Sequence, residues 1–342
     1  MTPPTYKALA LQATCNAVNS CCDRSEAQTV MLATIERLGK QIRASKAFIG
    51  ADLRLVVLPE YFLTGFPMGE SIEVWREKAA IAPEGREYEA LGKLAEANNV
   101  FLSGNAYETD KHFPDLYFQT SFVIDPAGSV ILRYRRLVSM FAPTPHDVWD
   151  KYLEIYGLDG VFPVARTDIG NLACIASEEI LYPEIARCHA MRGAEVFLHS
   201  SSEIGSPLLT QKNVAKLARA IENLAYVVSS NSAGIAGTDI PFASTDGGSK
   251  IVDYRGLVLS EASTGESMVA SATLDLNALR HERHRAGMPN MLARQRFELF
   301  AESYAQHSFY PANTLLSAKP ERAHFIRTQQ ETIEKLDKLG II

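Results

Sequence analysis

The 342-residue sequence predicts a mixed α/β fold. Short apolar runs that are typical of buried strands alternate with amphipathic segments that are typical of helices, and little of the chain has a linker-like composition. Two strands, 117–125 and 129–136, follow each other through the tight turn Pro126-Ala127-Gly128. A hairpin of this kind makes neighbouring strands antiparallel, so we expect a mixed sheet and not a purely parallel one.

The elements are predicted in order from the N-terminus. A strand at 6–13 precedes an amphipathic helix that begins at Ser25, whose hydroxyl is a suitable N-cap. The apolar strand 53–58 ends at Pro59-Glu60. Beyond it we expect helices at 88–98, 182–192 and 211–223, strands at 100–106, 117–125, 129–136, 171–176, 195–199 and 225–230, and short glycine-punctuated strands as far as residue 275.

The remainder of the chain is charged and helical in parts, and it offers no second set of core-forming strands. We therefore divide the sequence into a main domain, 1–280, and a C-terminal extension, 281–342.

Composition narrows the function classes. Hydrophobic residues make up 46% and charged residues 22% of the chain, which is ordinary for a soluble globular protein. The formal net charge of −6 argues against nucleic acid or an anionic membrane as a partner. No apolar run approaches the roughly 20 residues that span a bilayer. The first residues, MTPPTYKALALQAT, lack the features of a signal peptide, so we expect a cytoplasmic protein.

The five cysteines do not predict a disulfide framework or a zinc site, because their number is odd and their spacing irregular. We expect Cys21 and Cys22 to be reduced surface or loop thiols, and Cys174 to be a buried core thiol. The HERH sequence at 281–284 is not a HExxH motif and has no evident third ligand. Gly247-Gly248 is too short for a phosphate-binding loop. Neither a metal nor another cofactor is expected.

The segment LACIASEEILYPEIARC, 172–188, is the most informative part of the chain. It predicts an apolar strand, a polar turn that carries Ser177, Glu178 and Glu179, and a helix that opens near Pro183. A sharp turn between a strand and a helix is the geometry on which α/β enzymes present a nucleophile.

Six segments together resemble the nitrilase, or carbon–nitrogen hydrolase, superfamily in their order and composition. The resemblance extends from Tyr6 to about Asp275, and it implies a four-layer αββα sandwich of two mixed β-sheets flanked by helices. It also implies a small-molecule substrate and a homodimer or larger homo-oligomer, with the C-terminal extension at the interface between subunits. The six segments are PEYFLTGFP (59–67), RYRRLVSMF (133–141), ASEEILYPE (176–184), RGAEVFLHSSSE (192–203), AIENLAYVVSSNSAG (220–234) and DGGSKIVDYRG (246–256).

Members of this superfamily use a glutamate as general base, a cysteine as nucleophile, a lysine as oxyanion donor and a second glutamate. The base corresponds to Glu60. The lysine position is occupied by Arg136 and the cysteine position by Ser177, while the second glutamate would fall near Pro143. Arginine can still donate hydrogen bonds to an anion, but serine is a weaker nucleophile than cysteine and needs a base within hydrogen-bond reach.

Other residues are candidates for substrate binding. Tyr61 follows the base directly, and Glu178 and Glu179 follow Ser177; a structural role for Glu179 in holding the turn is the equal alternative. Segment 142–157 departs most from the family pattern, and its His146 and Trp149, with neighbouring acidic residues, form a substrate-specific lid or replace the missing glutamate. The alternative for this segment is a surface helix with a Pro-rich start.

Two functions follow from these residues. The first is hydrolysis of a small amide, nitrile or N-carbamoyl compound at an altered Glu60/Arg136/Ser177 site. The second is a catalytically inactive member of the family that binds a small ligand or a protein partner. Substitution of a natural cysteine by design would normally change the nucleophile alone, and the differences at Arg136 and Pro143 argue against that origin of Ser177.

Overall fold

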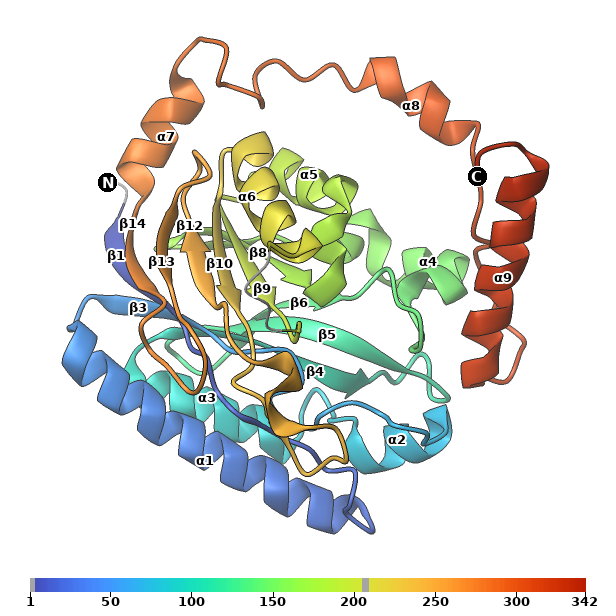
Figure 1. Cartoon of the computed structure of the whole chain (residues 1–342), viewed down its shortest axis with the longest axis horizontal. Coiled ribbons are helices and arrows are strands. Elements are labelled where there is room, and N and C mark those ends of the chain that lie inside the picture. The colour runs from blue at the N-terminus through green and yellow to red at the C-terminus, as the bar shows by residue number, and fades with distance from the viewer. Residues whose placement is uncertain (1–3, 205–208) are drawn as a thin grey trace.

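Two six-stranded β-sheets face each other in the computed structural model, which describes residues 4–204 and 209–342 (Figure 1). In each sheet parallel and antiparallel pairs are mixed, and β5 and β6 form the predicted hairpin. The first sheet has the order β14 (Ser271–Asp275), β1 (Thr5–Ala10), β3 (Leu53–Val57), β4 (Phe101–Thr109), β5 (Tyr117–Ile124) and β6 (Val130–Arg135). The second has the order β13 (Val258–Glu261), β12 (Lys250–Val252), β10 (Tyr226–Ser230), β9 (Val196–Ser200), β8 (Gly170–Ala176) and β7 (Ala165–Thr167). A short parallel pair joins β2 (Cys15–Asn16) to β11 (Ile235–Ala236).

Helices cover the outer face of each sheet (Figure 1). α1 (Arg24–Ile49) and α3 (Arg86–Asn98) pack on the first sheet, and α5 (Pro183–Met191) and α6 (Gln211–Asn223) pack on the second. The remaining helices are α2 (Ile72–Ala79), α4 (Trp149–Val161), α7 (Leu276–His284), α8 (Glu298–Ala305) and α9 (Arg322–Lys338), with single 3₁₀ turns η1 (Pro145–Val148), η2 (Ser177–Leu181) and η3 (Phe242–Thr245).

The alternation of side chains along β8 shows how the sequence builds these layers. Leu172, Cys174 and Ala176 lie in the core between the two sheets, whereas Ala173 and Ile175 pack toward α5 and α6. All five are fully buried, because successive residues of a strand point to opposite faces and both faces of this strand are covered. The four-layer αββα sandwich is thereby confirmed, as is the burial of the Cys174 thiol.

Some local predictions are corrected by the structure. The first strand ends at Ala10 and not at residue 13, and α1 begins at Arg24. Its N-cap is Asp23, whose carboxylate accepts a hydrogen bond from the Glu26 N–H at 2.9 Å, so Ser25 lies inside the first turn. Cys22 is exposed as expected, but Cys21, although it lies in a loop, is buried.

α2 was not predicted. It is a short helix whose N-cap is Ser71, and it buries Ile72 and Trp75 against the rest of the core.

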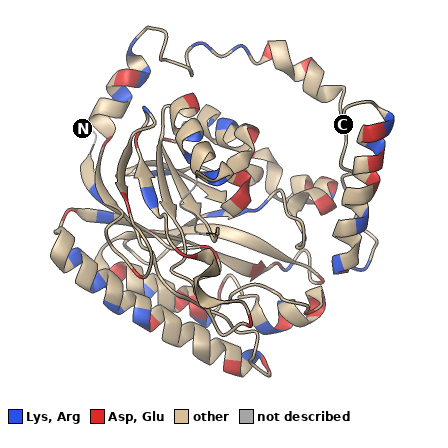
Figure 2. Cartoon of the chain, viewed as in Figure 1, with Lys and Arg blue, Asp and Glu red and all other residues tan. Residues whose placement is uncertain are grey.

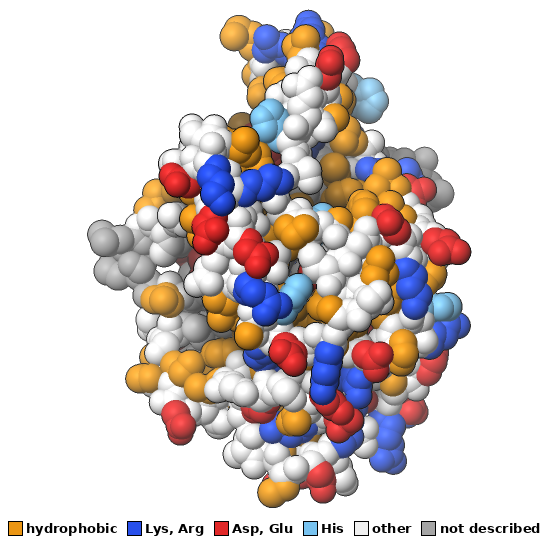
Figure 3. Space-filling model, turned by 90° about the vertical axis from the view of Figure 1, so that its right-hand side faces the viewer, with side chains coloured by type: hydrophobic (Ala, Val, Ile, Leu, Met, Phe, Trp, Pro, Cys, Tyr) orange, Lys and Arg blue, Asp and Glu red, His pale blue; other side chains and the backbone are white. Residues whose placement is uncertain are grey.

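The C-terminal segment leaves the main body after α7, arches past α5 and α6, and returns as α9 (Figure 1). The first residue of α9, Arg322, anchors this helix by donating hydrogen bonds to the carbonyl oxygens of Glu70 and Phe141. α8 buries none of its residues, and the side chains of Leu299 and Phe300 are more than half exposed. Figure 3 shows the protruding segment above a face on which hydrophobic, basic and acidic side chains are interspersed.

Acidic and basic residues are also interspersed along the helices (Figure 2). Within residues 4–204 and 209–342, no helix is long and apolar enough to cross a membrane.

Candidate active site

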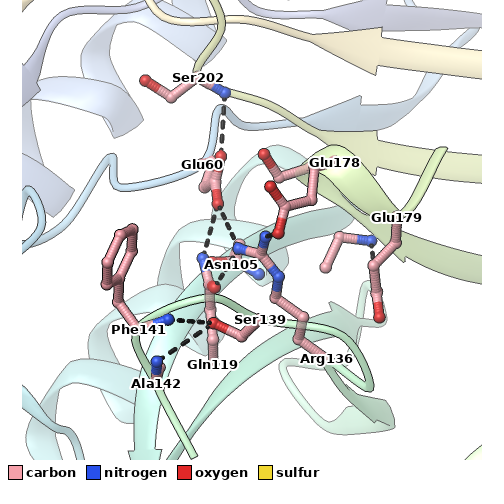
Figure 4. Close-up of polar contacts among 12 residues, drawn as sticks. Glu60, Asn105, Gln119, Arg136, Ser139, Phe141, Ala142, Glu178, Glu179 and Ser202 are labelled. Atoms are coloured by element: carbon pink, nitrogen blue, oxygen red, sulfur yellow. Dashed lines mark hydrogen bonds and ion pairs between the residues drawn. The ribbon is translucent and has the colours of Figure 1, made fainter. Parts of the chain in front are cut away.

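Glu60, Arg136 and Ser177 follow the ends of three strands, β3, β6 and β8, and lie where the two sheets meet. All three are buried. Figure 4 shows the Arg136 guanidinium between the carboxylates of Glu60 and Glu178. The structure therefore brings two of the predicted residues, Glu60 and Arg136, into direct contact.

The Glu60 carboxylate is fixed through both of its oxygens. Oε1 accepts hydrogen bonds from Gln119 Nε2 at 2.8 Å and from Arg136 Nη1 at 3.3 Å, and Oε2 accepts one from the Ser202 N–H at 3.1 Å. Gln119 also donates to Asn105 Oδ1 at 3.0 Å, which orients its amide. These three donors hold the nearly inaccessible carboxylate in one position.

The Arg136 guanidinium contacts four acceptors. Nε donates to the Val138 carbonyl oxygen at 2.7 Å, Nη1 donates to Gln119 Oε1 at 2.7 Å as well as to Glu60, and Nη2 forms an ion pair with Glu178. Burial disfavours the charged guanidinium, but the attraction of Glu60, Tyr61 and Glu178 outweighs it and raises the pKa of Arg136. This group is a permanent cation whose donors are largely occupied.

Ser177 has a φ of +49°, which is in the left-handed region, at the junction of β8 and η2. Its carbonyl oxygen accepts a hydrogen bond from His199 Nε2 at 2.8 Å, and its Oγ accepts one from Lys212 Nζ at 3.2 Å. Burial lowers the pKa of His199 to about 3, so the imidazole is neutral. Because a carbonyl oxygen only accepts, Nε2 carries the proton, and Nδ1 accepts from the Ser229 hydroxyl at 2.8 Å.

Glu179 holds the loop that follows β6. Its Oε1 accepts hydrogen bonds from the Leu137 N–H at 2.7 Å and the Val138 N–H at 3.0 Å, and its Oε2 accepts one from the Tyr134 hydroxyl at 2.7 Å. Burial raises the pKa of Glu179 to about 7, although Arg136 and these hydrogen bonds oppose the shift. These contacts give Glu179 the structural role that was the alternative to substrate binding.

Tyr61 lies beside this network. It has a φ of +60°, and its ring packs on Phe66 with centroids 5.2 Å apart. Burial and the neighbouring Glu60 carboxylate raise the pKa of Tyr61, so it stays a neutral phenol.

Pro143 occupies the position of the family's second glutamate and has no carboxylate. The loop that leads to it is held by Ser139, whose Oγ accepts hydrogen bonds from the Phe141 and Ala142 N–H groups at 3.4 and 3.2 Å.

His146 and Trp149 lie outside the Glu60–Arg136 network, in η1 and α4. They line a mainly apolar cavity of about 510 Å³ between the 137–139 loop, α5 and Tyr310 of the C-terminal segment. The His146 ring lies 6.0 Å from Trp149 and 6.2 Å from Tyr310, and burial lowers its pKa. The Asp147 carboxylate accepts hydrogen bonds from Thr144 and Thr314, so it holds the segment in place.

The described residues contain no group of three or more His, Cys, Asp or Glu side chains arranged to hold a metal ion. Acyl transfer needs a nucleophile, a proton acceptor and hydrogen-bond donors for an oxyanion, and at Ser177 the structure provides a hydroxyl with Lys212 as its hydrogen-bond partner.

The family model for carbon–nitrogen hydrolases matches residues 12–283. The chain belongs to the carbon–nitrogen hydrolase family. It is 30% identical over 241 residues to the 2-oxoglutaramate amidase of Bacillus subtilis, an alignment that covers 69% of this chain and 85% of the relative. It is 24% identical over 264 residues to a formamidase of Pseudomonas syringae pv. syringae, covering 77% and 71%.

Solved structures of this superfamily share the fold. A Saccharomyces cerevisiae protein of branch 10 of the nitrilase superfamily superposes with a TM-score of 0.65 at 20% identity, covering 85% of this chain and 97% of the other. An amidase from Nesterenkonia sp. superposes with a TM-score of 0.61 at 18% identity, covering 87% and 96%.

Sequence reasoning missed three residues of this carbon–nitrogen hydrolase site. Gln119 carries an amide on strand β5, whose residues are all buried, and a buried amide needs hydrogen-bond partners, so this signal was available once the strand was taken as buried. Ser202 contributes only its backbone N–H, which any residue would supply. Lys212 comes from a helix 35 residues after Ser177, and no local pattern connects the two.

Proposed function

We propose that this protein hydrolyses the carbon–nitrogen bond of a small amide, with Ser177 as the acyl acceptor. The observation that supports this most strongly is the backbone of Ser177. A non-glycine residue in the left-handed region costs on the order of 1–3 kcal/mol and persists where the surrounding structure imposes it, often at active sites. Here the strained residue stands at the turn where the family carries its nucleophile, and His199 fixes its carbonyl.

The named relatives support an amide as substrate, since one is described as a 2-oxoglutaramate amidase and another as a formamidase. The test is ammonia release from a panel that contains 2-oxoglutaramate, formamide, simple aliphatic and aromatic amides, nitriles and N-carbamoyl compounds. We expect release from at least one amide, loss of release in Ser177→Ala, and faster formation of a covalent adduct in Ser177→Cys, because a thiolate is the stronger nucleophile. Silence across the panel for both the natural protein and Ser177→Cys would overturn the proposal.

A second function, binding without hydrolysis, is favoured by one specific observation. The Arg136 guanidinium already contacts Glu60, Gln119, Glu178 and the Val138 carbonyl, so it has little capacity left for an oxyanion. For a binding protein, the same panel should raise the melting temperature without ammonia release. Turnover of any panel compound that depends on Ser177 would exclude this alternative.

A further inference from the structure

The lysine that contacts the Ser177 hydroxyl comes from α6 and not from the position of the family lysine. We propose that Lys212 is the proton acceptor for Ser177, in a serine–lysine dyad built between η2 and the first turn of α6. The proposal deepens the amide hydrolysis suggested above and rests on it for the identity of the substrate. It begins from the 3.2 Å hydrogen bond between Lys212 Nζ and Ser177 Oγ.

Glu60 is unsuited to deprotonate this serine. Its two carboxylate oxygens receive hydrogen bonds from Gln119, Arg136 and the Ser202 N–H, which hold them in place. Among the hydrogen bonds of residues 4–204 and 209–342, none joins Glu60 to Ser177, and the one side-chain partner of Ser177 Oγ is Lys212. A general base must lie within hydrogen-bond reach of the proton that it removes.

Arg136 is also unsuited, because arginine is not deprotonated in proteins and its guanidinium is paired with two carboxylates. Serine nucleophiles activated by a lysine are an established variant of the catalytic triad, so the chemistry needs no third residue.

The backbone around the dyad directs the two side chains toward each other. The left-handed conformation of Ser177 and the hydrogen bond from His199 to its carbonyl fix the backbone that carries the hydroxyl. α6 is capped by Thr210, whose hydroxyl accepts a hydrogen bond from the Asn213 N–H at 3.2 Å, and this fixes the helical turn that carries Lys212.

The position of Lys212 is unfavourable for helix stability. A lysine in the first turn of a helix lies at the positive end of the macrodipole. It is also four residues before Lys216, a spacing at which like charges repel, although Lys216 is paired with Glu203. A residue that costs stability where it stands is consistent with a role outside the helix.

The proposed step balances as follows. In its neutral form, with the nitrogen lone pair directed at the hydroxyl, the amine of Lys212 takes the Oγ proton while the bond from Oγ to the carbonyl carbon forms. The tetrahedral anion collapses with cleavage of the carbon–nitrogen bond, and the Lys212 ammonium returns the proton to the departing nitrogen, which leaves as ammonia. Water then gives one proton to Lys212 as it attacks the Ser177 ester, and that proton restores the serine hydroxyl when the carboxylic acid is released.

A fluorophosphonate probe tests the dyad without an amide substrate, because it phosphonylates an activated serine oxygen and releases fluoride. We expect labelling of the full-length protein at Ser177, located by intact mass and peptide mapping. Lys212→Met and Lys212→Arg should both slow it by about 100-fold or more, the usual size of a general-base contribution. Lys40→Met is the matched control, since Lys40 is an exposed helical lysine far from the site in an ion pair with Glu36, and it should label at the natural rate.

Two outcomes would overturn the dyad: a natural protein that is not labelled at Ser177, or a Lys212→Arg variant that labels as fast as the natural protein, since a guanidinium keeps the charge but cannot accept the proton. Circular dichroism of both Lys212 variants shows whether they are folded. Lys212-dependent labelling without ammonia release from any panel compound would refute amide hydrolysis and keep the dyad. Ammonia release that requires Ser177 but survives Lys212→Met would refute the dyad and keep amide hydrolysis.

Discussion

Removing the Arg136 guanidinium should cost this protein much of its stability. Glu60 is 1% exposed, and the Arg136 Nη1 atom lies 3.3 Å from its Oε1. At that separation, and with an effective dielectric constant of roughly 20, the attraction between unit charges is on the order of 5 kcal/mol. Loss of one partner of a buried pair typically costs about 3–5 kcal/mol, because the other charge is left uncompensated. We expect Arg136→Met to lower the free energy of unfolding by about 3–5 kcal/mol.

A double-mutant cycle separates the ion pair from the packing of the side chains. If the cost comes from the stranded Glu60 charge, Arg136→Met should cost about 2 kcal/mol less when Glu60→Gln is already present. The assay is urea unfolding followed by circular dichroism at pH 7. Lys93→Met serves as the control, because its ion pair with Glu89 on α3 is exposed, and we expect no measurable change. Additive effects, within about 0.5 kcal/mol, would refute the reasoning and assign the stability of the Glu60 carboxylate to Gln119 and Ser202.

Three further predictions concern other parts of the molecule. Burial raises the pKa of Glu179 to about 7, whereas an unfolded glutamate titrates near 4.3, so protonated Glu179 contributes stability that is fully present below about pH 4.3 and is lost as pH rises from there through 7, by about 4 kcal/mol at most. Glu179→Gln should remove this slope in urea unfolding between pH 4.5 and 8, and parallel slopes for the two proteins would count against it. If the cavity beside Trp149 holds the apolar part of a substrate, Trp149→Ala should raise the KM for aromatic amides at least about 10-fold, since about 1.4 kcal/mol of lost contact energy is a tenfold change in affinity, and should leave the KM for formamide unchanged. Equal effects on the two KM values would contradict this use of the cavity. We also propose that the protein is a homodimer or larger assembly in which the exposed Leu299 and Phe300 of α8 are covered. A chain that ends at residue 284 should then contain fewer subunits per particle by light scattering, and an unchanged number of subunits would contradict this.

The fold was predictable because its strands carry strong local signals. β8 is apolar on both faces, since both are covered, and it is bounded by a glycine and by polar residues. The hairpin of β5 and β6 was predictable from Pro126 and Gly128, the latter having a φ of +82°. α2 was missed because only eight residues form it, and so short a segment shows little periodicity.

Short sequence motifs predicted the positions of the site residues but not the contacts among them. The positions of Glu60, Arg136 and Ser177 follow from short segments that each end a strand, but the contacts among them do not. No pattern in the sequence tells that Arg136 bridges two carboxylates, because Glu178 comes from a segment 42 residues later. His146 and Trp149 were expected to act at the site, and in the structure they line a cavity beside the 137–139 loop, whose Val138 carbonyl contacts Arg136.

The departures from the family pattern are connected by charge. An arginine after β6 is long and forked enough to contact Glu60 and Glu178 together, and this pairing engages the carboxylate that would otherwise serve as the base. A nucleophile that depended on Glu60 would then lose its proton acceptor, whereas the Ser177 hydroxyl is hydrogen-bonded to Lys212. In the proposed dyad, Lys212 at the start of α6 takes the role of proton acceptor that Glu60 has in the family pattern, so that Arg136, Ser177 and Lys212 are explained as one rearrangement.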